Sequence, residues 1–301
     1  MQLRGGRARL SLQVVLQLAV NGLAAGAIYA LVALGLVLAY KATEVLNFAH
    51  GDLLMLAAFV GWALSGPAGL PFAPALLLTL AIVAALAYAI EALLVRRIVG
   101  QPQFAGVMLT IALAFMLRGA VSMGFGPESR SLPTPWTGQT TRLAGVVVAD
   151  LSLVILAVVL GVTAALLLFL QRTRVGVAMQ AASQNQLAAF LNGVPVKRIN
   201  SLVWALAGAL AALAGVLVAP VTLVDTSLWF VMLKSLAALV LGGFGSLAGA
   251  IVGGLLIGLI EQGFGVWGPD GSKDVVAYAV LILVLVLRPH GLLGEAHGKR
   301  V

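Results

Sequence analysis

The sequence predicts an all-α, polytopic membrane protein with about eight transmembrane helices, organised as a single domain over residues 1–301. Apolar residues make up 61% of the chain and charged residues only 9%, whereas a soluble domain is about half apolar and a quarter charged. Uncharged runs long enough to cross a bilayer as helices recur along the chain. Short polar or glycine-rich stretches separate these runs and leave no segment for a separate soluble domain.

The first span is predicted over residues 10–40. Small residues recur in it every four positions, a spacing that lets membrane helices approach closely: Gly22, Gly26 and Ala30. A polar patch follows at residues 41–52. The uncharged tract 53–90 is then divided into two spans by a group of turn-forming residues: Gly66, Pro67, Gly69 and Pro71.

A further span is predicted over residues 104–123. The loop 124–149 that follows is rich in Gly, Pro, Ser and Thr and contains Trp136, so we expect an extracytoplasmic loop at the membrane surface. The remaining apolar runs cover residues 151–171, 199–224, 234–261 and 275–287. Between the first two of these lies a polar segment, residues 172–200.

The net charge of +8 in so apolar a chain indicates contact with anionic lipid headgroups and a cytoplasmic protein surface. Nucleic acid is not an expected partner, because no basic run is interleaved with aromatic residues. Cysteine is absent, which excludes disulfide and thiol chemistry. The apolar run after the first arginines reaches Tyr40, which is too long for a cleaved signal peptide.

Basic residues in short loops set the expected orientation. Arg96 with Arg97, and the segment 172–200, lie two spans apart, and both are placed in the cytoplasm. Counting back three spans places the N-terminal arginines outside, against the rule, unless residues 41–52 form a re-entrant turn: Arg4, Arg7 and Arg9. Both N-terminal topologies stay open at this point.

The polar patch is the first candidate site, and its candidate pathway residues are Asn47, Phe48, His50, Gly51 and Asp52. Ionisable groups cost at least about 2.5 kcal/mol each at mid-bilayer, so they normally face a cavity or a partner. One interpretation is a broken helix that lines a pathway. The alternative is an interfacial loop whose polar groups meet water, with Asp52 in the favourable first turn of the next helix. A metal site is not expected, because His50 lacks a second ligand at suitable spacing.

The second candidate is a glycine-rich break within an apolar run, formed by Gly242, Gly243, Phe244, Gly245 and Ser246. Each glycine weakens a helix by about 1 kcal/mol relative to alanine, which favours an unwound joint between two half-helices. Discontinuous helices of this kind mark transport pathways. Close helix packing through Gly245, Gly249 and Gly253, at four-residue spacing, is the alternative.

The third candidate is the segment 172–200, in which one short helix is expected between Gly176 and Asn192, ended by Gly193 and Pro195. One face of this helix would carry Met179, Leu187, Phe190 and Leu191. The other would carry Ala181, Asn185 and Ala188. Such a helix either docks in a groove of a second protein or lies on the membrane surface. The flanking basic residues are Arg172, Arg174, Lys197 and Arg198.

Several stretches together resemble the permease subunit of branched-chain amino acid ATP-binding-cassette transporters, the LivH type, in the same order and spacing over nearly the whole chain. Among them are Val45–Asp52, Leu191–Ile199, Val240–Ser246, Lys273–Val276 and Arg288–Gly294. The chain contains no phosphate-binding G-x-x-x-x-G-K-[ST] motif and no catalytic or cofactor-binding motif, so we expect a transport subunit rather than an enzyme.

The resemblance implies a bacterial inner-membrane importer with a second permease subunit of the LivM type, two cytoplasmic ATPase subunits and an extracytoplasmic substrate-binding protein. It also implies that Arg174–Pro195 is the cytoplasmic coupling loop, whose helix sits in a groove of an ATPase. The residues then expected to couple to it are Arg172, Arg174, Met179, Asn185, Leu187, Phe190, Leu191, Gly193, Lys197 and Arg198. Where such loops usually carry further arginines and an acidic residue, this chain has Val177, Gln180, Gln184 and Asn185. Apolar packing is therefore expected to replace charge pairing.

Branched-chain or other hydrophobic amino acids are the expected substrates, and urea or short-chain amides are the alternative within the same family. A self-sufficient ion-coupled carrier or channel is a further alternative, with acidic groups as a proton relay: Glu44, Asp52, Glu91 and Glu261. No charge pairs are expected inside the spans, which argues against a carrier. An intramembrane enzyme would need a catalytic pair at mid-span, which the sequence does not show.

Overall fold

The computed structural model describes residues 12–98, 100–143, 146–269, 272–288 and 290–294. Its helices are α1 (Leu12–Thr43), α2 (His50–Ser65), α3 (Phe72–Leu93), η1 (Val95–Arg97), α4 (Gln103–Phe125), α5 (Asp150–Arg172), α6 (Arg174–Gln184), α7 (Gln186–Leu191), α8 (Val196–Val218), η2 (Thr226–Trp229), α9 (Phe230–Gly242), α10 (Leu247–Trp267) and α11 (Ser272–Leu287). Two short strands, β1 (Thr140–Leu143) and β2 (Val146–Ala149), form an antiparallel hairpin. The predicted all-α membrane class is confirmed.

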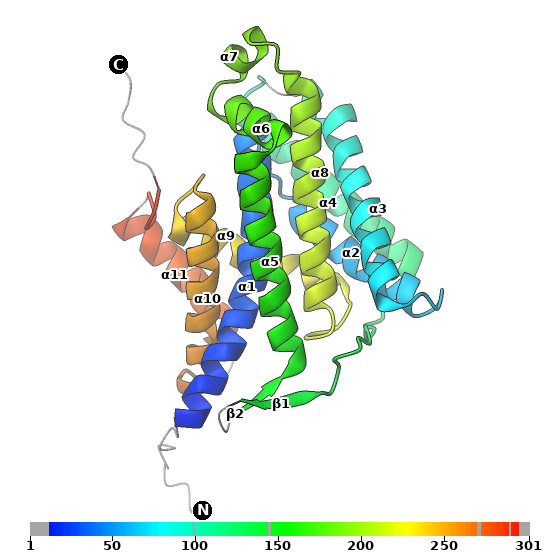
Figure 1. The fold of residues 1–301 in the computed structure, drawn as a ribbon, viewed down its shortest axis with the longest axis vertical. Helices are drawn as coiled ribbons and strands as arrows, with labels where there is room; N and C mark the ends of the chain where they lie inside the picture. The colour runs from blue at the N-terminus through cyan, green and yellow to red at the C-terminus, as the bar shows by residue number, and fades with distance from the viewer. Residues whose placement is uncertain (1–11, 99, 144–145, 270–271, 289, 295–301) are drawn as a thin grey trace, which may run out of the picture.

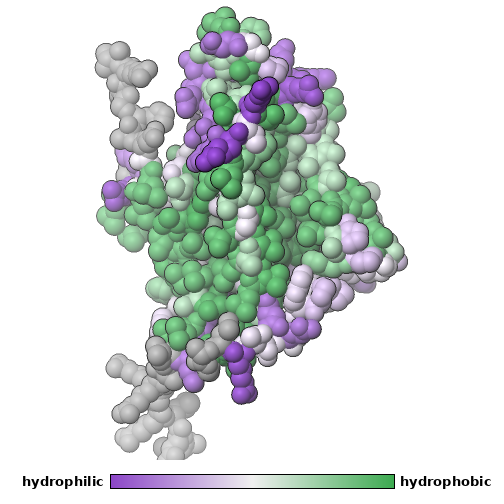
Figure 2. Space-filling view, viewed as in Figure 1, coloured by the Kyte–Doolittle hydropathy of each residue, from purple (hydrophilic) through white to green (hydrophobic). Residues whose placement is uncertain are grey.

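Six of the described helices are long and apolar enough to cross a membrane: α1, α3 with η1, α4, α5, α8 and α10. Two shorter apolar stretches, α2 and η2 with α9, add to them, and the predicted number of about eight spans is reached only if these are counted. Figure 2 shows apolar side chains covering the middle of the molecule, while polar side chains gather at its two ends. This distribution is the one expected of a bundle set in a hydrocarbon layer.

The β1–β2 hairpin lies at one end of the bundle, and α6 and α7 lie at the other (Figure 1). We call these the hairpin end and the α6–α7 end. Helix α1 starts at the hairpin end and finishes beneath α6, so the first described span runs toward the α6–α7 end. The chain then turns back through residues 44–49 and continues in α2 to the hairpin end. The region 41–52 therefore joins two helices that run in opposite directions, and the N-terminal topology stays a prediction; Arg4, Arg7 and Arg9 lie outside the described residues.

Helices α1 and α10 pack through the small residues that the sequence spacing predicts. A Cβ placed on Gly26 would lie 2.7 Å from the carbonyl oxygen of Gly254, and one on Gly258 would lie 2.3 Å from the carbonyl oxygen of Gly22. Both distances are far below van der Waals contact, so only glycine allows the two backbones to approach this closely. The predicted role of Gly22 and Gly26 in close helix packing is confirmed.

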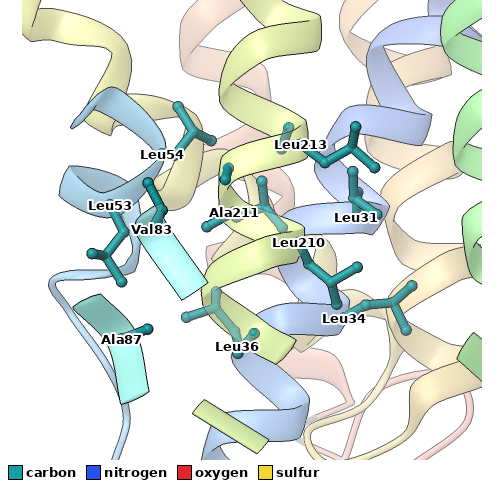
Figure 3. Packing of buried hydrophobic residues seen from close by; sticks show 14 of the residues in the cluster. Leu31, Leu34, Leu36, Leu53, Leu54, Val83, Ala87, Leu210, Ala211 and Leu213 are labelled. Atoms are coloured by element: carbon teal, nitrogen blue, oxygen red, sulfur yellow. The ribbon is translucent and has the colours of Figure 1, made fainter. Parts of the chain in front are cut away.

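Helix α8 packs between α2 and α3, with α1 alongside (Figure 3). Leu31 and Leu34 of α1 lie on one side of α8, Leu54 of α2 and Val83 of α3 lie on its other side, and Leu210 of α8 lies between them. All of these side chains are almost completely buried. These side chains form one hydrophobic core through the centre of the bundle, and the helices that pack on it carry the candidate site residues.

The glycine-rich break is a hairpin turn between two antiparallel helices, so the predicted joint between the halves of one crossing is wrong. Gly243 and Gly245 have φ angles of 113° and 91°, and Ser246 caps α10 by accepting a hydrogen bond from the Gly249 backbone nitrogen. Close packing also occurs, but through Gly249 and Gly253, which approach the carbonyl oxygens of Gly242 and Ala238. A Cβ on Gly245 would have no neighbour within 4 Å, so the predicted packing role is wrong for Gly245, whereas Gly242 of the break takes part in the packing.

The C-terminal residues complete this turn. The backbone nitrogens of Leu292 and Leu293 donate hydrogen bonds to the carbonyl oxygens of Leu241 and Gly242, each at 2.8 Å. These carbonyls end α9 and would otherwise lack intrahelical partners. Phe244, at the tip of the turn, packs edge to face against Tyr40 near the end of α1, with ring centroids 4.8 Å apart. The candidate residues 242–246 are thus a packed corner of the bundle.

Candidate functional site

The segment that links α5 to α8 forms two short helices instead of the single helix predicted. Asn185 breaks the segment with φ −157° and ψ 103°, and its side-chain oxygen accepts a hydrogen bond from the Ala188 backbone nitrogen at 2.9 Å. It therefore caps α7 and does not lie in the middle of a helix. Gly193, with a φ of 83°, ends the segment as predicted.

The predicted apolar face divides between the two helices. Met179 of α6 is 7% exposed and points into the bundle, which the sequence prediction had wrong. Leu187, Phe190 and Leu191 share one face of α7 and are 68%, 65% and 75% exposed. We call these three residues the α7 patch; it lies at the extreme tip of the α6–α7 end (Figures 1 and 2). The flanking bases are exposed as well: Arg172, Arg174, Lys197 and Arg198.

Contacts with the spanning helices hold the two short helices in place. Gly176 of α6 has no room for a side chain, because a Cβ there would lie 2.2 Å from the carbonyl oxygen of Phe169 in α5. The side-chain nitrogen of Gln186 donates a hydrogen bond to the carbonyl oxygen of Ala42, near the end of α1, at 2.8 Å. A force applied to α6 and α7 would therefore reach α5 and α1 directly.

Replacement of Asn185 by alanine is expected to destabilise α7 locally by about 1 kcal/mol, because the backbone nitrogen of Ala188 loses its cap. Hydrogen exchange of the α7 amides should become faster, while exchange in α5 and α8 stays unchanged. Asn185→Asp is the matched control, since aspartate caps a helix equally well. Equal exchange rates in the alanine variant and the parent protein would contradict the capping role.

Residues 45–50 are buried or half-buried within the bundle, whereas Glu44 is exposed, so the interpretation as a water-exposed interfacial loop is wrong for Asn47, Ala49 and His50. Asn47 is 2% exposed, and its side-chain oxygen accepts a hydrogen bond from the backbone nitrogen of Ala49 at 3.0 Å. His50 is fully buried, and a Cβ on Gly35 of α1 would lie 2.7 Å from its ring. Gly35 lies about two turns before the end of α1, so α2 begins roughly 12 Å below that end. Helix α2 is thus a short helix that starts inside the bundle, and the residues before it are packed; their role in a substrate pathway stays a prediction.

Three acidic groups of the bundle form ion pairs, two of them between different helices and one, Glu91 with Arg96, within the span of α3 and η1, which corrects the expectation that charge pairs are missing. Arg118 of α4 donates to both carboxylate oxygens of Asp52, at 3.0 and 3.3 Å. Arg96 donates to Glu91 at 3.1 Å and also binds the Lys197 carbonyl and the Ser201 hydroxyl. The third pair, Lys234 with Glu261, belongs to the cluster described next. Glu44, the fourth predicted relay residue, is exposed.

Lys234 of α9 lies between two carboxylates near the hairpin end. Its ammonium donates to Glu261 of α10 and to Asp274 of α11, each at 2.7 Å, and the Tyr29 hydroxyl donates to the other oxygen of Glu261 at 2.6 Å. Glu261 is buried, whereas the side chain of Asp274 is 76% exposed. The hydrogen bond from Lys234 lowers the pKa of Asp274, which lies in the first turn of α11 outside the six long spans. These four residues are called the Lys234 cluster.

A cavity of about 770 Å³ contains the Lys234 cluster. It is bounded by α1, the start of α5, the loop after α8, and helices α9, α10 and α11. Exposed rim residues such as Leu223 and Lys273 show that it opens at the surface. Sequence reasoning missed this site, although Lys234 was visible as a charge beside an apolar run. Among the described residues, no group of His, Asp and Glu side chains is placed to hold a metal ion.

Comparison with known proteins gives one family and several relatives. The family model described as "Branched-chain amino acid transport system / permease component" matches residues 18–285. The chain is 34% identical to the high-affinity branched-chain amino acid transport system permease protein BraD of Pseudomonas aeruginosa, over 95% of this chain and 98% of that protein. It is 29% identical to LivH of Escherichia coli, over 95% and 97%. A shorter match, 33% identical over 39% of each chain, relates it to the ribose import permease protein RbsC of Escherichia coli. No solved structure gives a significant match.

Proposed function

The chain belongs to the family of permease components of branched-chain amino acid transport systems, and we propose that it is one transmembrane subunit of an ATP-binding-cassette importer for these amino acids. The observation that carries the proposal is the match to permeases with that printed function over 95% of the chain. Urea and short-chain amides, the alternative substrates, have no counterpart among the relatives named above. The chain is a multi-pass membrane protein, and the bacterial inner membrane is its proposed location.

The α7 patch is the proposed contact with an ATPase subunit. Three large apolar side chains project from a helix that a hydrogen bond to α1 and the buried Ala189 hold against the bundle, and no part of the described chain covers these three side chains. An exposed apolar helix face of this kind fits a hydrophobic groove of a partner. Polar residues occupy positions where related loops are charged, so the proposed contact rests on apolar packing. The exposed flanking bases lie where headgroups or the ATPase surface would meet them.

Transmission from the ATPase to the substrate pathway is proposed to run through α1. At the α6–α7 end, α1 accepts the hydrogen bond from Gln186. At the hairpin end, the same helix packs tightly on α10 and lines the 770 Å³ cavity. A rigid helix that contacts both ends can move the cavity wall when α6 and α7 move. A second permease subunit of the LivM type, two ATPase subunits and a binding protein that docks at the hairpin end complete the proposed importer.

The self-sufficient carrier is the second candidate, and the match to transport-system permeases over 95% of the chain favours the importer over it. The carboxylates that a carrier would use as a proton relay, Asp52, Glu91 and Glu261, each form an ion pair with a basic group. The fourth acid, Glu44, is exposed and has no described ion-pair partner. These groups therefore act as fixed links between helices in the proposed function.

Reconstitution of the complete importer in proteoliposomes tests the proposal. Radiolabelled leucine, isoleucine and valine should accumulate only when the binding protein, both permease subunits, the ATPases and ATP are present. Omission of the ATPase subunits is the control. Accumulation by this chain alone would instead identify a carrier, and accumulation of urea in place of leucine would identify an amide permease.

A further inference from the structure

We propose that the cavity at the hairpin end is a transit site for the substrate, with the Lys234 cluster binding the charged groups of a zwitterionic amino acid and the apolar wall receiving its side chain. This inference rests on the proposed function and adds to it a location and a set of contacts. A cavity of about 770 Å³ is within the range of roughly 300–1,000 Å³ that is usual for small-molecule sites.

The ammonium of Lys234 is placed to bind a carboxylate. Its side chain is only 15% exposed, and it lines the cavity. A lysine ammonium has three hydrogen-bond donors, of which Glu261 and Asp274 occupy two. The third is available to a carboxylate that enters the cavity, and the charge-assisted bond would be strong where water is scarce.

The two carboxylates of the cluster have different roles. Glu261 is 2% exposed and accepts hydrogen bonds from both Lys234 and Tyr29, so it holds the ammonium in position. Asp274 is mostly exposed at the rim and has accepting capacity beyond its bond to Lys234. Asp274 is therefore the group placed to receive the substrate ammonium, next to the cation that receives the substrate carboxylate.

Apolar residues form the wall beside this charged group. Ala25 and Ile28 lie on α1, the first of them one turn before Tyr29, and Ile155, Leu228 and Val231 face the same cavity. A hydrophobic side chain would be shielded there while its backbone groups meet Lys234 and Asp274. The combination matches an apolar amino acid and fits neither an uncharged sugar nor a simple cation.

The test measures leucine transported per ATP hydrolysed in proteoliposomes that contain the complete importer. Lys234→Met should lower this ratio about tenfold or more, because hydrolysis triggered by the loaded binding protein continues while transit fails. Lys234→Arg, which keeps the charge, should stay within about twofold of the parent importer. An equal fall in transport and hydrolysis would indicate only a structural role for Lys234 and would overturn the proposal.

Ala25→Leu tests the apolar wall without removing a charge. It should lower leucine transport more than valine transport, because the added side chain takes up space in the cavity. Ala85→Leu is the matched control, since Ala85 is exposed on α3, away from the cavity. An unchanged leucine-to-valine ratio in Ala25→Leu, with a functional parent importer, would overturn the transit site and leave the proposed function intact. A parent importer that moves no branched-chain amino acid would overturn both.

A phospholipid headgroup that carries an ammonium and a phosphate shares this charge pattern. The Lys234 variants are therefore compared in vesicles of phosphatidylcholine alone and in vesicles that contain phosphatidylethanolamine. The same loss in both compositions supports the transit site. A loss confined to phosphatidylethanolamine vesicles would assign the cavity to lipid and overturn the proposal.

Discussion

Replacement of Phe190 by aspartate is expected to lower ATP-driven uptake by the assembled importer by roughly a hundredfold, while the chain still inserts into the membrane. Phe190 is 65% exposed, so a charge there costs the isolated chain little. In the complex, a lost aromatic anchor costs on the order of 2–4 kcal/mol of binding, and each 1.4 kcal/mol is about tenfold. The measurements are leucine uptake in proteoliposomes and co-purification of the ATPase subunits.

Two further variants separate docking from general damage. Phe190→Leu keeps an apolar side chain and should retain most of the uptake. Gly193→Pro should resemble the aspartate variant, because proline holds φ near −65° and Gly193 requires a φ of 83°, which displaces the end of α7. Full uptake with Phe190→Asp, and ATPase subunits that still co-purify, would show that the α7 patch is not the coupling contact.

The positions of the long spans could be predicted because length and hydropathy are local properties. The span expected over residues 104–123 is α4, Gln103–Phe125, and the run 151–171 is α5, Asp150–Arg172. The run 199–224 extends past the end of α8 at Val218, because the residues after it stay apolar while the chain leaves the helix. Hydropathy alone does not register that change.

The division of the coupling segment into two helices was not predicted, because it depends on one residue. Asn185 tolerates helical and capping conformations, and the choice follows from contacts of Gln186 and Met179 with the bundle. Gly193, in contrast, could be predicted as the stop, because a left-handed φ before proline is a local signal.

The Lys234 cluster and the other ion pairs were beyond sequence reasoning for a different reason. Lys234 and Asp274 are 40 positions apart, and Asp52 and Arg118 are 66 apart. Only the packing of α9 on α11, and of α2 on α4, brings each pair together. The available signal was Arg118 itself, a charge inside an apolar run, which requires a partner or a cavity but does not say which.

The Asp52–Arg118 pair has one fully enclosed partner and one that reaches the surface. Asp52 is 1% exposed, while the side chain of Arg118 is 25% exposed and lies over the ring of Trp229, 4.0 Å from its centroid. The pair joins α2 to α4, and the stacking adds η2 to the same junction. Removal of the Arg118 charge therefore leaves a buried carboxylate without a partner. Removal of the Asp52 charge leaves a guanidinium that still stacks on Trp229 and still reaches water.

Arg118→Met is accordingly expected to destabilise the protein by about 3–5 kcal/mol, because it leaves the Asp52 carboxylate buried without its counter-ion. Asp52→Asn should lower the free energy of unfolding by less, about 1–2 kcal/mol, since the Arg118 guanidinium still stacks on Trp229 and still contacts water. The double variant should be more stable than Arg118→Met alone, because no unpaired carboxylate remains. Thermal unfolding in detergent ranks the stability of the parent protein, the two single variants and the double variant. Additive losses in the double variant would mean that the two side chains do not stabilise each other, and that the junction of α2, α4 and η2 depends on apolar packing alone.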